Sequence, residues 1–246
     1  MSKPRLVVVG SSNTDMVVKC ERIPSGGETV LGGEFVMVPG GKGANQAVCA
    51  AKLGADVKFV ARVGDDSFGE ASLDNLAATG VDTRFVTKDH STPSGVALIV
   101  VDEKGENAIV VAPGANLRLT PEDVDRARDA IAGADAVVLQ LEIPQDTVAH
   151  TIEVARSLGV RIVLNPAPIR PISRELLGMV DVLIPNQHEA ADLIGRPGEG
   201  RDIDPSTAAT ELRAYGAGAV VITLGGKGSY VCAEGISEVI EPMRVT

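Results

Sequence analysis

The segment Gly40–Ala47 places three glycines in its first four residues, beside a lysine and an asparagine. Glycine tolerates positive φ and lets a backbone come close to a ligand. Helix-forming residues follow at once, and Gly54 stands where a helix C-cap glycine belongs. The segment is therefore a glycine loop leading into a helix N-terminus, which favours polar or anionic ligands. It matches neither the Walker A loop nor the dinucleotide fingerprint, and a tight turn before a core helix is the alternative interpretation.

Polar residues also stand where several expected β-strands end. In open α/β sheets, ligands bind beyond the carboxyl ends of the strands, so these positions are candidates for a site. Each residue alone has a simpler interpretation, because Asn and Asp commonly cap helices and form turns. Glu142 is harder to explain in that way, since a carboxylate is seldom buried without a partner. The residues concerned are Asn13, Asp15, Glu142, Asn165, Asn186 and Thr223.

The chemistry of the candidates separates into two groups. The first combines two carboxylates, two amides and an ammonium group, which suits a polyol better than an apolar ligand. The second combines a hydroxyl with a glycine loop, whose N–H donors suit a phosphate-bearing ligand. The first group is Asn13, Asp15, Lys42, Asn45 and Glu142, and the second is Thr223 with the loop Gly225–Gly228.

The hydrophobic pattern predicts an α/β fold. Leu6–Gly10 is a continuous apolar run, typical of a buried parallel strand. After residue 120, strands alternate with helices, the first of which begins at Thr120-Pro121. This alternation implies a mainly parallel sheet with helices on both faces, in one domain over 1–246. Later strands are expected at Ala136–Glu142, Arg161–Asn165, Val180–Pro185 and Ala219–Leu224, and helices at about 145–158, 173–177, 188–194 and 205–215.

Two stretches, 16–38 and 94–112, contain strand patterns without helices and predict a separate small β-sheet. In the first, 28–38 suggests two short strands split by Gly32-Gly33. The second is a hairpin whose strand 94–101 is apolar on both faces. Because a hairpin covered on one side should alternate apolar and polar residues, we expect something to cover its second face.

Composition narrows the possible functions. The chain has 246 residues, 44% of them hydrophobic, which is enough for a substantial core. A net charge of -10 and only 2% aromatic residues argue against nucleic acid as a partner. The N-terminus does not resemble a signal peptide, and no apolar run approaches membrane-spanning length. The scattered cysteines, Cys20, Cys49 and Cys232, predict neither disulfides nor a zinc site and favour the cytoplasm.

A series of ordered motifs runs through essentially the whole chain. They are Gly10-Ser11-x-Asn13-x-Asp15, Pro24-x-x-Gly27-Glu28-Thr29, the Gly40–Ala47 segment, Gly64-Asp65-Asp66-x-x-Gly69, Gly105-Glu106-Asn107, Gly114-Ala115-Asn116, Asn165-Pro166-Ala167-Pro168, Asn186-x-x-Glu189 and Thr223-Leu224-Gly225-x-x-Gly228. With these motifs the sequence resembles the ribokinases of the PfkB family of sugar kinases, rather than fructokinases or adenosine kinases. The resemblance implies an α/β, ribokinase-like fold in which 16–38 and 94–112 form a β lid over the sugar. In that family the lid also makes a homodimer.

The resemblance also implies a reaction and residue roles. The reaction is ATP-dependent phosphorylation of ribose at its 5-hydroxyl, giving ribose 5-phosphate. Glu189 would help to organise Mg²⁺ through water. Ribose would be bound by Asn13, Thr14, Asp15, Gly41, Lys42, Gly43, Ala44, Asn45 and Glu142, and ATP by Asn186, Thr223, Leu224, Gly225, Gly226, Lys227 and Gly228.

The sequence departs from the family pattern at its end. The family's Asp-Thr-x-Gly-Ala-Gly-Asp segment carries the catalytic base and begins the monovalent-cation (K⁺) loop, and this sequence ends at Thr246 before it. No catalytic residue is therefore assigned here, and we expect the printed chain to be inactive as a kinase. Two alternatives stay open: a non-catalytic ribose-binding remnant, and a kinase for another pentose or a nucleoside.

Overall fold

The computed structural model describes residues 3–200 and 202–243. The chain forms two compact units that interleave in sequence, and β1 (Arg5–Val9) is divided between them. Unit 1 consists of Val8–Ala127 and Glu142–Pro144, with the described residues before Arg5. Unit 2 consists of Arg5–Val7, Arg128–Leu141 and the described residues from Gln145 onward.

Unit 1 contains a parallel strand pair and the helices that follow its glycine-rich turns. β4 and β5 pair in parallel, and the buried side chains of β4 include Val57, Phe59 and Val60. Asp66 caps α2, because its side chain accepts a hydrogen bond from Gly69 N. The strand β5 was not anticipated from the sequence. The elements are α1 (Lys42–Lys52), β4 (Asp56–Gly64), α2 (Ser67–Ala78), β5 (Asp82–Asp89), the 3₁₀ helix η1 (Gly114–Arg118) and α3 (Pro121–Arg126).

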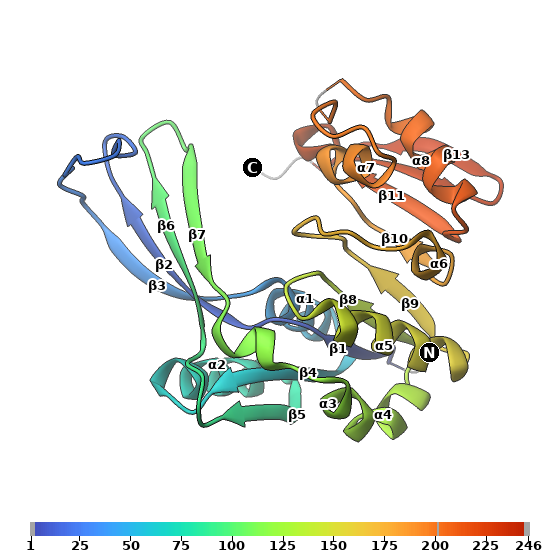
Figure 1. Cartoon of the computed structure of the whole chain (residues 1–246), viewed down its shortest axis with the longest axis horizontal. Coiled ribbons are helices and arrows are strands. Elements are labelled where there is room, and N and C mark those ends of the chain that lie inside the picture. Colours follow the sequence, from blue (N-terminus) through green and yellow to red (C-terminus); the bar gives the residue numbers. More distant parts are fainter. Residues whose placement is uncertain (1–2, 201, 244–246) are drawn as a thin grey trace. The chain divides into compact units, whose positions relative to one another are not determined.

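Unit 1 also contains a four-stranded sheet in the order β3-β2-β6-β7, which Figure 1 shows in blue and green. β2 pairs with β6 in parallel, and the other two pairings are antiparallel. The two helix-free stretches of the sequence thus supply one sheet. Its strands are β2 (Asn13–Lys19), β3 (Phe35–Gly40), β6 (Gly95–Val101) and β7 (Asn107–Ala112).

Two boundaries in this sheet differ from the expected ones. β2 begins at Asn13, three residues before the expected start, and so includes Asn13 and Asp15, which were expected to follow the end of the first strand. Between residues 28 and 38, one strand begins at Phe35 where two were expected. Gly32 and Gly33 have no side chains to pack on a sheet, and Gly33 N instead bonds Lys19 O, closing the loop ahead of β3.

Unit 2 contains the strand–helix alternation that the sequence predicted. Its strands lie in the order β13-β12-β11-β10-β9-β8, with β8 to β11 parallel. α8 packs on β11 and β12. The strands are β8 (Ala136–Leu139), β9 (Arg161–Leu164), β10 (Val182–Leu183), β11 (Ala219–Thr223), β12 (Ser229–Ala233) and β13 (Ile236–Ile240), and the helices are α4 (Arg128–Ala132), α5 (Gln145–Ser157), α6 (Arg174–Leu177), α7 (Gln187–Leu193) and α8 (Pro205–Ala214).

The alternation does not continue to the end of the chain as expected. β12 and β13 form an antiparallel hairpin in which Ala233 pairs with Ile236. This register leaves only Glu234 and Gly235 in the turn, and Gly235 takes a φ of 72°. A two-residue turn of this kind favours a hairpin over a crossover helix.

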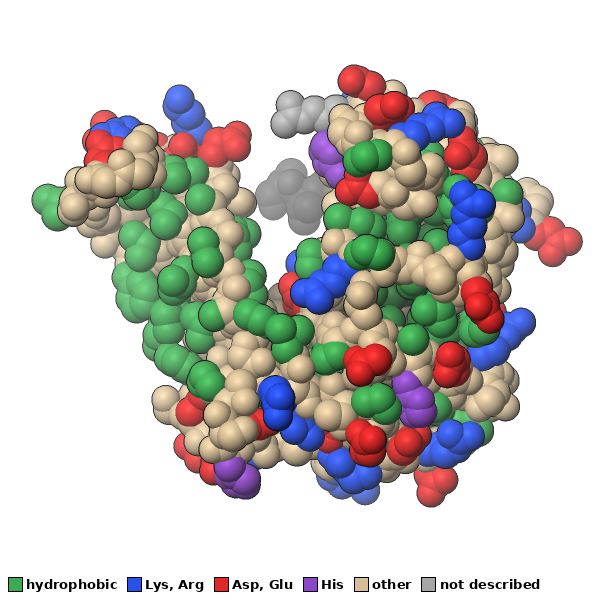
Figure 2. Space-filling view, in the orientation of Figure 1, with side chains coloured by type: hydrophobic (Ala, Val, Ile, Leu, Met, Phe, Trp, Pro, Cys, Tyr) green, Lys and Arg blue, Asp and Glu red, His purple; other side chains and the backbone are tan. Residues whose placement is uncertain are grey.

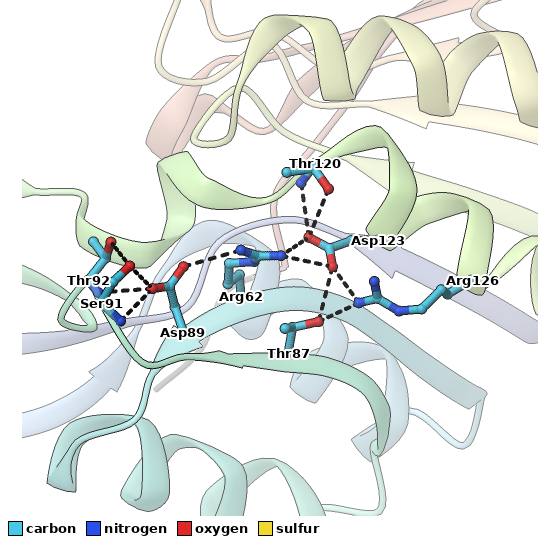
Figure 3. Close-up of polar contacts among 8 residues, drawn as sticks. All are labelled: Arg62, Thr87, Asp89, Ser91, Thr92, Thr120, Asp123 and Arg126. Atoms are coloured by element: carbon cyan, nitrogen blue, oxygen red, sulfur yellow. Dashed lines mark hydrogen bonds and ion pairs between the residues drawn. The ribbon is translucent and has the colours of Figure 1, made fainter.

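A buried ion-pair network, which we call the Arg62 network, joins the elements of unit 1 (Figure 3). Arg62, on β4, contacts Asp89 at 3.2 Å and Asp123 at 3.0 Å. Arg126 pairs with the same Asp123, whose side chain is fully buried. Burial alone would raise the pKa of Asp123, but the hydrogen bond from Thr120 N and the two ion pairs lower it below its usual value.

The Arg62 network also fixes the turn that precedes β6. Asp89 accepts hydrogen bonds from the Ser91 hydroxyl, Ser91 N and Thr92 N. These bonds, the Ser91 hydroxyl first, hold the pKa of the Asp89 carboxyl well below its usual range. Asp66 then holds Ser94 through both Ser94 N and Ser94 Oγ. The start of β6 is therefore fixed from two sides.

Candidate functional site

Glu142 is held at the N-terminus of α1 in unit 1. Its Oε2 accepts hydrogen bonds from Ser11 Oγ and, at 3.0 Å, from Lys42 N. Its Oε1 lies 3.3 Å from Lys42 Nζ, and its side chain is only 16% exposed. A carboxylate at this end of a helix is stabilised by the free N–H groups and by the helix dipole. Glu142 is therefore a fixed negative charge with one edge held by the protein.

The glycines of the loop before α1 make this arrangement possible. Gly41 has a φ of 88°, which a residue with a side chain rarely adopts. A Cβ at Gly43 would lie 2.6 Å from Ser11 N. Ala44 N donates to Ser11 O, so the first turn of α1 lies directly against the chain that follows β1. The glycine loop thus brings the helix start close to Ser11.

Asp15 belongs to the same electrostatic group. Burial and the negative charge of Glu142 raise the pKa of Asp15, and Lys42 partly offsets them. Gly40, on β3, leaves the space that the Asp15 carboxylate occupies, because a Cβ there would lie 2.1 Å from Asp15 Oδ1. Unit 1 therefore gathers two carboxylates, which can accept the hydrogens of neighbouring hydroxyl groups, and one lysine, which can donate to a hydroxyl oxygen.

Asn13 lies on the Asp15 face of β2, since side chains two residues apart in a strand point the same way. It is buried, and its Oδ1 accepts a 2.7 Å hydrogen bond from Asn116 Nδ2. Thr14 points to the opposite face, so only its backbone can serve a site beside Asp15. Asn45 lies on the first turn of α1 with an exposed side chain, and Ala44 is buried beneath it.

A cavity of about 150 Å³ lies elsewhere, between β3 and α2. Asn13, Thr14, Met37 and Pro39 line it together with Phe68, and neither Asp15 nor Glu142 contributes. Its lining is mostly apolar and comes from β2, β3 and α2. The carboxylate group is consequently not part of this cavity.

Sequence reasoning gave no role to several residues that shape the carboxylate group. Ser11 and Gly40 appeared only within motifs, although one bonds Glu142 and the other makes room for Asp15. Gly95 was not singled out, and a Cβ there would lie 2.1 Å from Asn13 Oδ1. Asn116 belongs to the Gly114-Ala115-Asn116 motif, and that motif was the sequence feature that could have pointed to it as a partner of Asn13.

The candidates for nucleotide binding lie in unit 2. Asn186 caps α7, because its side chain accepts from Glu189 N at 2.8 Å. Glu189 Oε2 in turn accepts from Asn186 N at 2.8 Å, which completes a capping box. Asn186 also pairs with Thr223 in an isolated parallel bridge. Both residues thus stand at the carboxyl ends of neighbouring strands.

The loop after β11 is closed upon itself. Leu224 N donates to Gly228 O at 2.8 Å, and Gly225–Lys227 form the 3₁₀ helix η2. Thr223 and Lys227 are exposed, and a Cβ added at Gly225 or Gly226 would meet nothing within 4 Å. The loop therefore offers an open surface with a hydroxyl and an ammonium group. Within residues 3–200 and 202–243, no three His, Cys, Asp or Glu side chains are grouped as metal ligands.

The comparison with protein families matches residues 3–245 to the pfkB family carbohydrate kinase model. The chain belongs to the PfkB family of carbohydrate kinases. Among curated relatives, it is 47% identical to the ribokinase of Bacillus subtilis over 76% of this chain and 64% of that protein. It is 38% identical to the deoxyribokinase of Salmonella typhi over 91% of this chain and 73% of that protein. The expected relationship to ribokinases is confirmed.

Solved structures agree with the fold. The ribokinase of Arabidopsis thaliana, determined as a complex with ribose and ATP, matches with a TM-score of 0.86 and 34% identity. The match covers 98% of this chain and 79% of that one. The expected ribokinase-like α/β class is confirmed. The chain thus spans between 64% and 79% of the length of these relatives.

Among the described residues, no helix has both the length and the apolar character needed to cross a membrane.

Proposed function

We propose that the protein is an ATP-dependent kinase that transfers a phosphoryl group to the 5-hydroxyl of ribose, giving ribose 5-phosphate. The observation that carries this proposal is the grouping of Asp15 and Glu142 with Lys42 in unit 1. Glu142 is held by the protein through Oε2, which leaves its Oε1 beside Lys42 Nζ, and with it the Asp15 carboxylate, to accept hydroxyl hydrogens. A polyol provides such hydrogens in a fixed spatial pattern.

The remaining sugar candidates complete a polar surface in this proposal. Asn13 and Asn45 add amides, and Gly41, Gly43 and Ala44 let the backbone at the start of α1 approach the sugar. Positioning a hydroxyl in this way accounts for much of the rate that a phosphotransferase gains. The base and the monovalent-cation (K⁺) site of the family are assigned to no described residue, and Thr246 lies outside the described residues.

ATP and Mg²⁺ are proposed to bind unit 2. Thr223 and Lys227 are exposed donors on an open glycine loop, which fits a nucleotide phosphate. Asn186 stands beside Thr223. Mg²⁺ would supply charge neutralisation on the phosphates. Glu189 would act on it through water, since its Oε2 already serves the capping box and no group of metal ligands surrounds it in the described chain.

We also propose a homodimer formed through the four-stranded sheet, which would act as the lid. Figure 2 shows hydrophobic side chains gathered over this sheet, and they include Phe35, Met37, Leu98 and Val110, each at least half exposed. A contiguous exposed apolar patch commonly marks a protein–protein interface. A cytoplasmic location is proposed from the three cysteines, which are free thiols.

Calorimetric titration tests the sugar assignment. Ribose, 2-deoxyribose and inosine are titrated separately into the purified chain, with the Asp15→Ala variant as the control for site binding. We expect ribose to bind most tightly and Asp15→Ala to lose that heat. Tighter binding of 2-deoxyribose would favour the second candidate, a deoxyribose kinase, which the similarity to a deoxyribokinase keeps open. Binding of none of the three would contradict the proposal.

Coupled ADP-release kinetics test catalysis. The purified chain is assayed with ribose, ATP and Mg²⁺. Ribose-dependent ADP release supports the kinase, and ribose binding without turnover supports the non-catalytic alternative.

A further inference from the structure

Asn116 is a buried amide that contacts two consecutive residues at the start of β2. It is 1% exposed and lies in η1, about one hundred residues later in the chain. Its Oδ1 accepts from Ser12 N at 2.8 Å. Its Nδ2 lies 2.7 Å from Asn13 Oδ1, 3.1 Å from Ser12 O and 2.9 Å from Pro113 O. All the polar atoms of this side chain are therefore used inside unit 1.

These contacts determine which end of each amide is oxygen and which is nitrogen. A backbone N–H only donates, so the Asn116 atom facing Ser12 N must be the oxygen. The Nδ2 group of Asn116, which only donates, then faces two backbone carbonyls and the Asn13 amide. Asn13 must consequently turn its oxygen toward Asn116. Its own Nδ2 group is left on the other side of the amide.

The surroundings of Asn13 prevent it from turning over freely. A Cβ on Gly95 would lie 2.1 Å from Asn13 Oδ1 and 2.3 Å from Asn116 Nδ2. The two amides thus fill the space that this glycine leaves. If Asn13 rotated by half a turn, its NH₂ group would face the NH₂ group of Asn116 in a buried place, and the hydrogen bond between the two amides would be lost.

From this geometry we propose that Asn116 is a positioning residue that presents Asn13 Nδ2 as a hydrogen-bond donor to the sugar. The inference rests on the proposed function and adds to it which atom of Asn13 faces the sugar, namely the donor Nδ2. Asn13 and Asp15 lie on one face of β2, so a donor and an acceptor stand side by side there. A hydroxyl group placed between them would accept from Asn13 and donate to Asp15, which a group lacking either capacity could not do.

Asn13→Asp tests the donor while keeping the contact with Asn116. The aspartate oxygen still accepts from Asn116 Nδ2, but the atom facing the sugar becomes an acceptor. We expect ribose affinity to fall by ~10-fold or more, because the donor at residue 13 is replaced by an acceptor like that of Asp15. Asn75→Asp on α2 adds the same charge in unit 1 away from the site and should leave ribose affinity within twofold. Unchanged ribose affinity in Asn13→Asp would overturn the proposal.

Asn116→Asp tests the positioning role itself. Its second oxygen would repel Asn13 Oδ1 and favour the turned-over amide, so we expect weaker ribose binding with an unchanged affinity for ATP. In an Asn13→Ala background the same substitution should change the ribose affinity by less than twofold, because the residue it acts through is gone. If Asn116→Asp lowered ribose affinity by the same factor in the wild-type and Asn13→Ala backgrounds, its role would be independent of Asn13 and the proposal would be overturned.

Side-chain amide exchange provides a test that needs no sugar and does not depend on Asn116→Asp being folded. In ¹⁵N-labelled wild-type protein, the NH₂ protons of Asn116 should exchange slowly with water and those of Asn13 rapidly. The side-chain NH₂ signal that disappears in Asn13→Asp is the signal of Asn13. Slow exchange at Asn13 with fast exchange at Asn116 would refute the orientation. If ribose does not bind at all while this pattern is found, the sugar assignment fails and the orientation stands.

Discussion

Glu142 contacts both ends of Lys42, accepting a hydrogen bond from its backbone N–H at 3.0 Å and lying 3.3 Å from its Nζ. The two residues are one hundred positions apart in the sequence. Lys42 opens α1, so one residue gives Glu142 both a helix-terminal donor and a counter-charge. The position of this carboxylate is thus set by α1, whereas the residue itself follows β8 in the sequence.

Glu142→Gln should weaken ribose binding without unfolding unit 1. The amide oxygen can still accept from Ser11 Oγ and Lys42 N, but the ion pair and the charge-assisted bond to the sugar are lost. We expect the ribose dissociation constant to rise by ~10-fold. The pKa of Asp15 should fall, because the repulsion that raises it is removed. Calorimetry and a ¹³C-carboxyl titration measure the two effects, with exposed Glu103→Gln as the control. A higher pKa of Asp15 in this variant would be inconsistent with the geometry.

Asp15→Asn should stabilise the protein at neutral pH. The pKa of Asp15 is raised in the folded state, so the folded chain binds more protons than the unfolded chain as the pH passes between the two values. Stability conferred by wild-type Asp15 therefore falls with rising pH through that window. Urea unfolding from pH 3 to pH 8 should show the advantage of Asp15→Asn growing with pH. An advantage that shrinks as the pH rises would be the opposite of this result.

Gly40→Ala should impair sugar binding through Asp15. The added Cβ would overlap the Asp15 carboxylate, which must then move. We expect ribose affinity to fall at least as far as in Glu142→Gln, by ~10-fold or more. Gly26→Ala is the matched control, since nothing lies within 4 Å of a Cβ there. Equal ribose affinities for the two variants, measured by calorimetry, would show that the Asp15 position is unimportant.

Arg62→Leu should destabilise unit 1. The substitution leaves the Asp89 and Asp123 carboxylates without a shared partner, and Asp123 is fully buried. Breaking a buried ion pair costs ~3–5 kcal/mol, and the remaining Arg126 contact favours the lower end of this range. Arg84→Leu removes an exposed pair with Asp82 and should cost much less. Chemical denaturation compares the free energies of unfolding of the two variants. Similar decreases would show that the Arg62 network adds no more stability than an exposed ion pair.

Leu98→Asp should abolish self-association through the lid. Leu98 pairs with Met16 on the face of the sheet opposite Asp15, and it is 53% exposed. Ile99 pairs with Val17 and so lies on the Asp15 face, where a substitution would disturb the proposed sugar site as well. Light scattering at micromolar concentration should find a dimer for wild type and for the control Leu53→Asp, and a monomer for Leu98→Asp. A monomeric wild-type chain would remove the basis of the proposal.

The sequence predicted the elements whose cause is local. Periodicity located most strands of unit 2, and the Thr120-Pro121 start of α3 follows from capping chemistry. β5 escaped notice because its pattern mixes charged and apolar residues, with Arg84 and Lys88 among them. Its position depends on pairing with β4, a long-range contact that the local sequence pattern does not predict.

The candidate site was predictable to a similar degree. The residue types of Asp15, Lys42 and Glu142 indicated hydroxyl chemistry, and their positions at strand ends indicated a shared edge. The space for Asp15 could not be inferred, since it depends on Gly40, which comes from another strand. The space for Asn13 depends in the same way on Gly95. The Asn116 contacts were equally hidden, because they join η1 to β2 across most of unit 1.

Unit 1 is not a continuous stretch of chain, because it takes Glu142–Pro144 from beyond Ala127. During synthesis, Ser11 and Lys42 therefore leave the ribosome well before their carboxylate partner exists. At ~5–20 residues per second, the hundred residues between Lys42 and Glu142 take ~5–20 seconds to add. Throughout that interval Lys42 N has no carboxylate to bond. A fragment ending at Ala127 would display the glycine loop without the carboxylate that holds its lysine in place.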